Sequence, residues 1–390
     1  LTLLHTMNTH ASLLGSLTPQ QFIDTIWQQQ PWLIRNALPA AIDIVDGNDL
    51  AGIACEPDSD ARLVISTPEQ THWQCESAPF KSKRFKTLPT SHWTLLVQSV
   101  DHWIPEVQAL LQHFLFLPRW RLDDIMISYA VDGGGVGPHF DYYDVFLIQA
   151  SGQRRWQTGQ RCDENSALRE GEPLRLLQDF HSENDQVLVP GDMLYVPAGL
   201  AHWGTAVGDD CITISVGFRA ASQRELLQTA LENIAETLPA HLRYTDTPSA
   251  IATDSFCINE AAIDNLLTLW DTLPRDTIRT ALADALGELA TETQHSEDKA
   301  PEKNLTHKSL QKYLQSNTGL RVEHHPASRF SYRLTEAGNA TLYADGGTLH
   351  TTAALAKAVC HGCITAADCP SDTEQQLVLA LVNQGSLLLI

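Results

Sequence analysis

Two histidines and one aspartate are the residues of this chain best suited to bind a transition metal. His139 and Asp141 are separated by one residue, and His202 lies further along the chain. Two imidazoles and one carboxylate form the ligand set that holds ferrous iron on one face and leaves the opposite positions open. Side chains two apart on a strand point the same way, so a strand through His139 and Asp141 would let both converge. The sequence therefore predicts an iron site whose ligands lie on two separate strands.

A short His-x-Asp pair also occurs by chance, so its surroundings decide the interpretation. Residues 133–138, Gly-Gly-Gly-Val-Gly-Pro, lead into His139 and indicate tight turns or a close approach of the backbone to a ligand. No Gly-Lys-Ser/Thr ending follows them, which argues against a phosphate-binding loop. Residues 191–197 are typical of a turn followed by a strand that ends at a proline, Pro197, shortly before His202.

Hydrophobic periodicity predicts the elements that position these ligands. Thr18, Pro19 and Gln21 begin a helix well, and residues 32–35 follow as a short strand. A second helix is predicted over 102–114. The predicted strands are 124–130, 145–149, 153–157, 186–189, 193–196 and 211–218. Together these patterns favour a small β-barrel flanked by helices.

The stretch from Asp123 to Trp156, with Pro-Ala-Gly-Leu-Ala-His at 197–202, resembles the JmjC/cupin-4 oxygenases, in particular the bacterial ribosomal oxygenases. The resemblance is strong over about residues 15–220 and weaker afterwards. Ligand spacing, glycine loop and a Gly-x-Arg-x-Trp motif at 152–156 occur in the family's order. It implies a fold that is mainly β plus α, a double-stranded β-helix, with Fe(II) held by His139, Asp141 and His202. Members of that subgroup hydroxylate an arginine in a large-subunit ribosomal protein.

The same resemblance implies 2-oxoglutarate as the co-substrate. Arg154 occupies the position of the family's basic residue, where a guanidinium would hold the far carboxylate through two parallel hydrogen bonds. On a strand Arg154 shares the face of Trp156, while Arg155 points away. Ser128 is carried over as a second donor to the same carboxylate. The alternative for Arg154 is a solvated charge on the outside of the barrel.

The residues that follow the ligands are candidates for the substrate entrance. Alternation predicts Tyr143 on the ligand face, and Tyr142 and Asp144 facing outward. Ordinary packing and surface charge are equally good interpretations of all three. Asp132, at the start of the glycine loop, is a candidate contact for a cationic substrate.

The net charge of −21 is unevenly distributed. Residues 301–390 hold seven basic and seven acidic side chains, so the first 300 residues hold 19 basic and 40 acidic ones. An acidic body disfavours direct binding to nucleic acid and suits a basic protein partner such as a ribosomal protein. Solubility alone is the competing explanation for the charge.

No apolar run of eighteen or more residues occurs, which predicts no transmembrane helix, and residues 1–7 lack the pattern of a secretory signal. A cytoplasmic location is expected. The eight cysteines form no disulfide framework. Cys360, Cys363 and Cys369 lack a matching second pair, so we interpret them as thiols rather than as a zinc site.

Four segments are predicted along the chain: a catalytic domain at 1–220, a helical region at 221–290, a linker at 291–305 and a C-terminal domain at 306–390. Helices are predicted at 223–238, 260–273 and 275–289, and the resemblance implies that this stretch makes a homodimer. In the last domain, strands at 330–334, 340–344 and 386–390 accompany helices at 352–360 and 372–384, and the resemblance implies a winged helix.

An Fe(II)- and 2-oxoglutarate-dependent protein hydroxylase is the leading functional hypothesis. A cupin dioxygenase of another reaction is the first alternative, and Arg154 argues against it, because only 2-oxoglutarate chemistry requires a cation about one co-substrate length from the iron. A demethylase acting on another substrate is also an alternative. It differs from a hydroxylase only in which carbon the oxidant reaches, so the sequence leaves both open. A non-catalytic metal-binding cupin that docks a partner is the second alternative. An intact His-Asp-His set argues against it.

Overall fold

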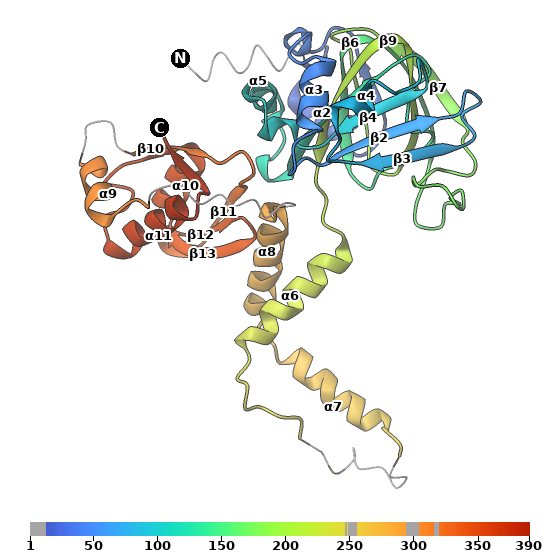
Figure 1. Ribbon diagram of the computed structural model, residues 1–390. Helices are drawn as coiled ribbons and strands as arrows, with labels where there is room; N and C mark the ends of the chain where they lie inside the picture. Colours follow the sequence, from blue (N-terminus) through green and yellow to red (C-terminus); the bar gives the residue numbers. More distant parts are fainter. Residues whose placement is uncertain (1–12, 246–247, 249–255, 294–303, 316–319) are drawn as a thin grey trace. The chain divides into compact units, whose positions relative to one another are not determined.

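The computed structural model describes residues 13–245, 248, 256–293, 304–315 and 320–390 of the chain. These fall into two compact units, residues 1–220 and residues 221–390, which we describe one at a time (Figure 1). The predictions for residues 1–7 and for most of the linker at 291–305 lie outside the described residues. Within the described part of the chain, no helix is both long and apolar enough to cross a membrane.

A nine-stranded antiparallel sheet forms the body of the first unit. Along the sheet the order is β1-β8-β6-β9-β5-β4-β2-β3, with β7 beside β6. The strands are β1 (Trp32–Ile34), β2 (Ala61–Ser66), β3 (Trp73–Ser77), β4 (Trp93–Val97), β5 (Leu122–Ala130), β6 (Asp144–Arg161), β7 (Ser182–Leu188), β8 (Met193–Val196) and β9 (Leu200–Phe218).

The pairing of β6 with β9 dominates this sheet. The first part of β6, from Asp144 to Gln149, faces the end of β9, and its second part faces residues 200–207. Register shifts between Gln149 and Gln153 separate the two parts, as expected where a long strand bends. The strands predicted at 145–149 and 153–157 are therefore one continuous strand. Its second part brings Arg154, Trp156 and Thr158 opposite the segment of β9 that contains His202.

Helices pack on one face of the sheet. They are α2 (Pro19–Thr25), α3 (Gly47–Ile53), α4 (Ser82–Phe85) and α5 (Pro105–Ala109), with 3₁₀ helices η1 (Pro39–Ala41), η2 (Val100–His102), η3 (Leu110–Phe114) and η4 (Arg119–Arg121). The large core of this unit contains Phe22 from α2 and Phe146 and Tyr195 from the sheet. The ring centroids of Phe22 and Tyr195 lie 5.3 Å apart, and those of Phe146 and Tyr195 lie 4.9 Å apart.

The predicted start of the first helix is confirmed, because Thr18 and Gln21 form a reciprocal capping box at α2. The single helix predicted over 102–114 is wrong. Ile104, just before Pro105, is extended, with φ −123° and ψ 109°, because a proline disfavours the helical conformation of the residue before it. The segment is consequently divided into η2, α5 and η3.

Three strands, β2, β3 and β4, were not predicted. In β2, both Leu63 and Val64 are buried, so two neighbouring residues face different apolar environments and the two-residue alternation is lost. Such a strand reads as a short apolar run, which periodicity alone does not assign. The apolar environment on one side, around Val64, Trp73 and Leu96, is separate from the main core.

The second unit begins with three helices, α6 (Gln223–Thr237), α7 (Glu260–Asp271) and α8 (Arg275–Thr291), close to their predicted bounds. After them come α9 (His307–Leu314), α10 (Ala353–His361), α11 (Asp372–Asn383) and η6 (Glu336–Gly338). One small sheet has the order β14 (Cys363–Ile364), β10 (Leu320–His324), β15 (Leu387–Leu389), and the other β11 (Phe330–Leu334), β12 (Asn339–Ala344), β13 (Gly347–Thr352). Helices α10 and α11 and strands β11, β12 and β15 confirm predicted elements, whereas β10, β13 and β14 were not predicted.

Helix α8 packs against the β11–β12–β13 sheet. A Cβ built on Gly287 would lie 2.5 Å from the ring of Tyr343, so only glycine permits this approach. The Tyr343 hydroxyl donates to Asp284 at 2.7 Å, and Arg333 pairs with the same carboxylate at 3.2 Å. The division of this unit into a helical region, a linker and a last domain stays a prediction.

Candidate metal centre and its surroundings

The structure brings His139, Asp141 and His202 together. The Asp141 carboxylate lies 3.9 Å from Nε2 of His139 and 3.6 Å from Nε2 of His202, and the two ring centroids are 4.3 Å apart. The three ligand atoms lie within 4.8 Å of one another. Among the described residues, this is the one group of three or more metal-ligating side chains so arranged. Its composition matches the set typical of a non-haem ferrous site.

The backbone that carries the ligands differs from the predicted strand. His139 and Asp141 lie in a loop, and His139 makes only an isolated bridge to His202, with N–H···O distances of 3.0 and 2.8 Å. The predicted strand through both ligands is therefore wrong, although the ligands converge. The bridge ties the first histidine directly to β9, which carries the second.

Hydrogen bonds also orient both imidazoles. Nδ1 of His139 lies 2.9 Å from the carbonyl of Gly137, and Nδ1 of His202 lies 3.0 Å from the carbonyl of Leu200. A carbonyl partner requires a proton on Nδ1, which leaves Nε2 as the lone-pair donor. Both Nε2 atoms are those nearest to Asp141, so the tautomers suit metal binding.

Burial, followed by the charge of His139, lowers the pKa of His202 to about 4, although Asp141 opposes this shift. At neutral pH the ring is therefore uncharged, which is the form that ligates a metal.

Arg154 is almost fully buried, and Trp156 connects it to this centre, since the ring centroids of Trp156 and His202 lie 5.9 Å apart. One of its Nη atoms donates to Ser128 Oγ at 3.3 Å, and its guanidinium carbon lies 5.6 Å from the Trp156 ring centroid. Its Nε and other Nη atom are buried and have no hydrogen-bond partner among the described residues. Arg155 is exposed and pairs with Asp185 instead. A buried, incompletely satisfied guanidinium is costly unless an anion completes it, so its surroundings suit a carboxylate.

A threonine that was not predicted as a site residue lies on the same face. Strand β4 pairs Leu96 with Ser128, so Thr94, two residues before Leu96, shares the face of Ser128. Thr94 is 1% exposed, and its hydroxyl has no partner among the described residues. The signal in the sequence was one hydroxyl within the apolar run 93–97, and β4 itself was not predicted.

The glycines before His139 allow backbone segments to approach closely. A Cβ on Gly134 would lie 2.2 Å from the Trp93 carbonyl, and one on Gly135 would lie 2.3 Å from the Gly204 carbonyl. The close approach expected from the sequence is therefore between backbone segments. Asp132 accepts a hydrogen bond from the Gly208 amide at 2.8 Å, which ties the start of this loop to β9.

The residues after Asp141 do not alternate as predicted, because 142 and 143 form a bend rather than a strand. Tyr142 and Tyr143 are both exposed, at 49% and 43%. Asp144, which was expected to face outward, is fully buried, and that prediction is wrong. The two tyrosines offer aromatic surface directly after a metal ligand, and Arg175 stacks over Tyr142 at 5.7 Å.

Asp124, on β5, is an acid whose neighbours are also acids. Burial, followed by the charges of Asp123 and Asp101, raises the pKa of Asp124 to about 6, although Ser99 donates to it through its amide at 2.9 Å and its hydroxyl at 3.1 Å. The folded protein therefore holds this proton more tightly than the unfolded chain does. The resulting stabilisation is complete below the unfolded pKa and is lost as the pH rises through 6.

We expect Asp124→Asn to weaken this pH dependence. The amide keeps the shape and an acceptor for Ser99 but cannot ionise, so the variant should gain stability relative to the wild type as the pH rises from 5 to 7.5. The gain should be about 1.4 kcal/mol, because roughly one pKa unit of the shift is titrated within this pH range. Urea unfolding of both proteins at the two pH values measures it. A stability difference that is the same at both would contradict the assigned cause.

The interpretation of Cys360, Cys363 and Cys369 as thiols rather than as a zinc site stays a prediction. Cys360, Cys363 and Cys369 are free thiols, and no metal-ligating group in the described residues includes them. Burial raises the pKa of Cys360 to about 12 and that of Cys369, also beside Glu374 and Asp368, to about 11. In the absence of a metal, thiols of this kind stay protonated at neutral pH.

Several known proteins are similar to part of this chain. Residues 109–226 match the JmjC domain family. The probable ribosomal oxygenase of Haemophilus influenzae is 41% identical over 212 residues, 54% of this chain and 52% of that protein. Ribosomal protein uL16 3-hydroxylase of Escherichia coli is 41% identical over 206 residues, 53% of this chain and 54% of that protein. These matches span about half the length of the curated relatives.

Solved structures match over a greater length. The X-ray structure of E. coli ycfD superposes with a TM-score of 0.81 at 29% identity, covering 96% of this chain and 99% of that one. The same ribosomal oxygenase in complex with cobalt and 2-oxoglutarate superposes with a TM-score of 0.79, also at 29% identity, covering 96% of this chain and 98% of that one. The likeness thus includes both units of the chain.

Proposed function

This chain carries a JmjC domain and is a homologue of the bacterial ribosomal oxygenases, and from that premise we propose that it is an Fe(II)- and 2-oxoglutarate-dependent protein hydroxylase. One observation carries the proposal. His139, Asp141 and His202 converge, and a buried arginine with unsatisfied donors packs against Trp156, whose ring neighbours that of His202. A metal site alone would not need that arginine, whereas a dicarboxylate co-substrate does.

The metal would be held by Nε2 of both histidines and by the Asp141 carboxylate. These three groups come from one side, which leaves coordination positions open for other ligands. The carbonyl partners of both Nδ1 atoms keep each ring in the required tautomer and orientation. The metal would be Fe(II), the ion to which this ligand set with open positions is suited.

Arg154 would hold the far carboxylate of 2-oxoglutarate through its unsatisfied donors, with Ser128 as a second donor. Trp156, stacked against the guanidinium, would keep it in place. Bound iron and 2-oxoglutarate supply the oxidising chemistry that activates dioxygen. The protein's own residues orient the co-substrate, exclude water around its carboxylate and present the substrate carbon to the open side of the metal.

The substrate we propose is an arginine of a large-subunit ribosomal protein. The support is the homologue named as a ribosomal protein uL16 3-hydroxylase and the acidic charge of the first 300 residues. A basic protein is attracted by such a surface, whereas nucleic acid is repelled. The exposed rings of Tyr142 and Tyr143, just after Asp141, provide contact area for an incoming side chain. A ribosomal substrate would place the reaction in the cytoplasm.

A reconstituted reaction tests this function. Purified protein with Fe(II), 2-oxoglutarate and a basic ribosomal protein should form succinate and add one oxygen, about 16 Da by atomic mass, to the substrate. The arginine that carries the mark is identified by fragmentation of the peptide. Iron-dependent succinate formation without any mark on ribosomal proteins would reject the substrate while retaining the chemistry. Absence of both would reject the proposed function.

We also propose that the helical part of the second unit forms a homodimer. Helix α7 has no buried residue, and its large apolar side chains are all exposed, between 41% and 56%: Ile263, Leu266, Leu267, Leu269 and Trp270. Apolar patches of this kind mark interaction surfaces. We propose a winged-helix-like fold for the strands and helices after residue 306. We also propose that this domain contacts protein rather than DNA, because residues 301–390 carry no net charge.

The double variant Leu266→Glu, Trp270→Glu should convert the protein from dimer to monomer. The two positions lie one helical turn apart, so both charges fall on the same apolar stripe, where burial of an unpaired carboxylate is costly. Size-exclusion chromatography with light scattering measures the mass. Leu115→Glu is the control, because Leu115 is 45% exposed in the first unit. A double variant that stays dimeric would move the interface elsewhere.

A further inference from the structure

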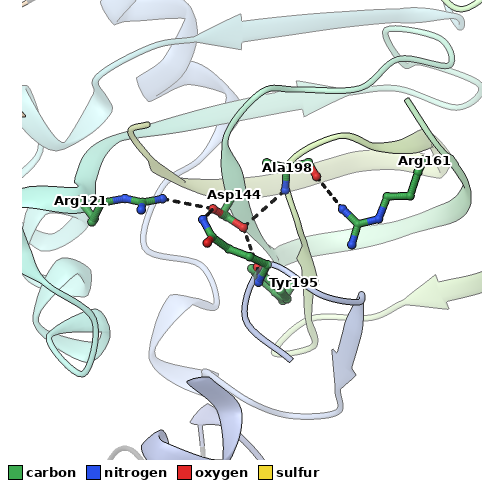
Figure 2. Close-up of polar contacts among 6 residues, drawn as sticks. Arg121, Asp144, Arg161, Tyr195 and Ala198 are labelled. Atoms are coloured by element: carbon green, nitrogen blue, oxygen red, sulfur yellow. Dashed lines mark hydrogen bonds and ion pairs between the residues drawn. The ribbon is translucent and has the colours of Figure 1, made fainter. Parts of the chain in front are cut away.

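Asp144 is a fully buried carboxylate three residues after the ligand Asp141 (Figure 2). Four donors converge on it. One oxygen accepts from the Tyr195 hydroxyl at 2.6 Å and from the Ala198 amide at 3.4 Å. The other accepts from the Gln28 side chain at 3.0 Å and from Arg121 at 3.3 Å. The chain thus pairs and hydrogen-bonds a charge that would otherwise be costly to bury.

These donors come from four different segments. Gln28 follows α2, Arg121 ends η4, Tyr195 lies in β8, and Ala198 lies in the turn that leads into β9. The Tyr195 hydroxyl also accepts a hydrogen bond from the backbone amide of Gln28 at 2.8 Å. Burial, followed by the charge of Asp144, raises the pKa of Tyr195, so the hydroxyl stays protonated and remains a donor. Asp144 is the point at which the four segments meet.

The turn bound by Asp144 is the one that places two of the three metal ligands. Its Ala198 amide donates to Asp144, and its Ala198 carbonyl accepts from Arg161 at 2.7 Å, as Figure 2 shows. Its next amide, that of Gly199, donates to the carbonyl of Asp141 at 2.7 Å. Its last carbonyl, that of Leu200, is the partner of His202 Nδ1.

We propose that Asp144 is a positioning residue for the metal centre. It fixes the 197–200 turn, and through that turn it sets the position of the Asp141 backbone and the orientation of the His202 ring. The inference rests on the proposed function, since it assumes that these ligands bind a metal. It assigns to Asp144 a role beyond stabilising the fold. Loss of Asp144 should change how the protein binds the metal, at a site the residue does not touch.

Asp192, in the turn before β8 of the same sheet, provides a matched control. It is 2% exposed and pairs with Arg35 at 2.6 Å. It also accepts backbone amides, from Asn36 at 3.0 Å and from Val189 at 3.1 Å. Both aspartates are buried, ion-paired and bound to a turn. The turn at Asp192 joins β7 to β8 and carries no proposed ligand. The Asp192→Asn variant therefore measures only the loss of fold stability that follows when a buried, ion-paired aspartate is replaced.

The test compares Asp144→Asn with Asp192→Asn in the full chain, using cobalt(II) as the probe. Cobalt affinity and the d–d absorption bands report the ligand geometry, and thermal unfolding of the metal-free protein reports the structural cost. Both variants should lower the unfolding temperature. Only Asp144→Asn should alter the bands and weaken cobalt binding. The loss should be about 10-fold, the lower end of the range for a lost hydrogen-bond partner of a metal ligand, because Asp144 acts on the ligands through the turn. With iron, its kcat should fall while the KM for 2-oxoglutarate stays the same.

Tyr195→Phe keeps the inference testable should Asp144→Asn not fold. It removes a single donor to Asp144 and should weaken cobalt binding in the same direction by a smaller factor. If Asp144→Asn folds and binds cobalt with the affinity and absorption bands of the wild type, the inference is overturned. If Asp144→Asn does not fold, the same result in Tyr195→Phe overturns it. Equal weakening in Asp192→Asn would also overturn it. Failure of the wild-type protein to bind cobalt would instead overturn the proposed metal site, and the inference with it.

Discussion

Asp141→Ala is expected to abolish hydroxylation and to weaken iron binding more than any other single change. The carboxylate is the one anionic ligand of the set, and it lies 3.6 to 3.9 Å from both imidazole nitrogens. Its removal takes away a coordinating oxygen and the charge that balances the cation. The loss of affinity should exceed the roughly 10- to 100-fold that removal of an outer partner causes.

Iron titration of the metal-free protein and succinate formation measure the two effects. Asp185→Ala is the control, because Asp185 is an exposed carboxylate of the same unit whose partner, Arg155, points away from the site. That variant should bind iron as the wild type does. Full activity in Asp141→Ala would mean that the proposed ligand set is wrong.

Arg154→Ala should raise the KM for 2-oxoglutarate while leaving iron bound. The lost contact is a pair of charge-assisted hydrogen bonds, worth about 2–3 kcal/mol, or roughly a 30- to 150-fold change in affinity. The side chain of Arg154 makes one described hydrogen bond, to Ser128 and not to a metal ligand, so iron affinity should be unchanged. Initial rates at saturating iron, measured over a range of 2-oxoglutarate concentrations, give the KM.

Arg155→Ala is the matched control for this prediction. The two arginines are neighbours on β6, but Arg155 is exposed and pairs with Asp185, so its loss should leave the KM unchanged. An Arg154→Lys variant should recover part of the affinity, because it keeps the charge without the bidentate geometry. An unchanged KM in Arg154→Ala would place the co-substrate carboxylate elsewhere.

The ligands were predictable from the sequence because their residue types and spacing are specific as a set. Strand alternation also placed Arg154 beside Trp156 and Arg155 on the outer face, since β6 is regular there. The same rule failed at Asp144, because the chain bends at 142 and 143, before β6 begins. Local alternation describes a strand, and it carries no information where a loop holds the residues.

The role suggested for Asp144 lies beyond any local pattern. Its partners Gln28, Arg121 and Tyr195 are far apart in the sequence, so the cluster exists only in the folded chain. An aspartate before an apolar strand indicates a solvated strand end, and only tertiary contacts bury it. Thr94 was missed for a related reason, since β4 is buried on both faces and shows no periodicity.

The most direct measurement of the central claim is mass spectrometry of ribosomal proteins from cells with and without this chain. Cells that contain it should carry one oxygen, about 16 Da by atomic mass, on an arginine of a single large-subunit protein. Deletion should remove the mark, wild-type protein should restore it, and Asp141→Ala should not. Ribosomal proteins of identical mass in all four strains would contradict the claim.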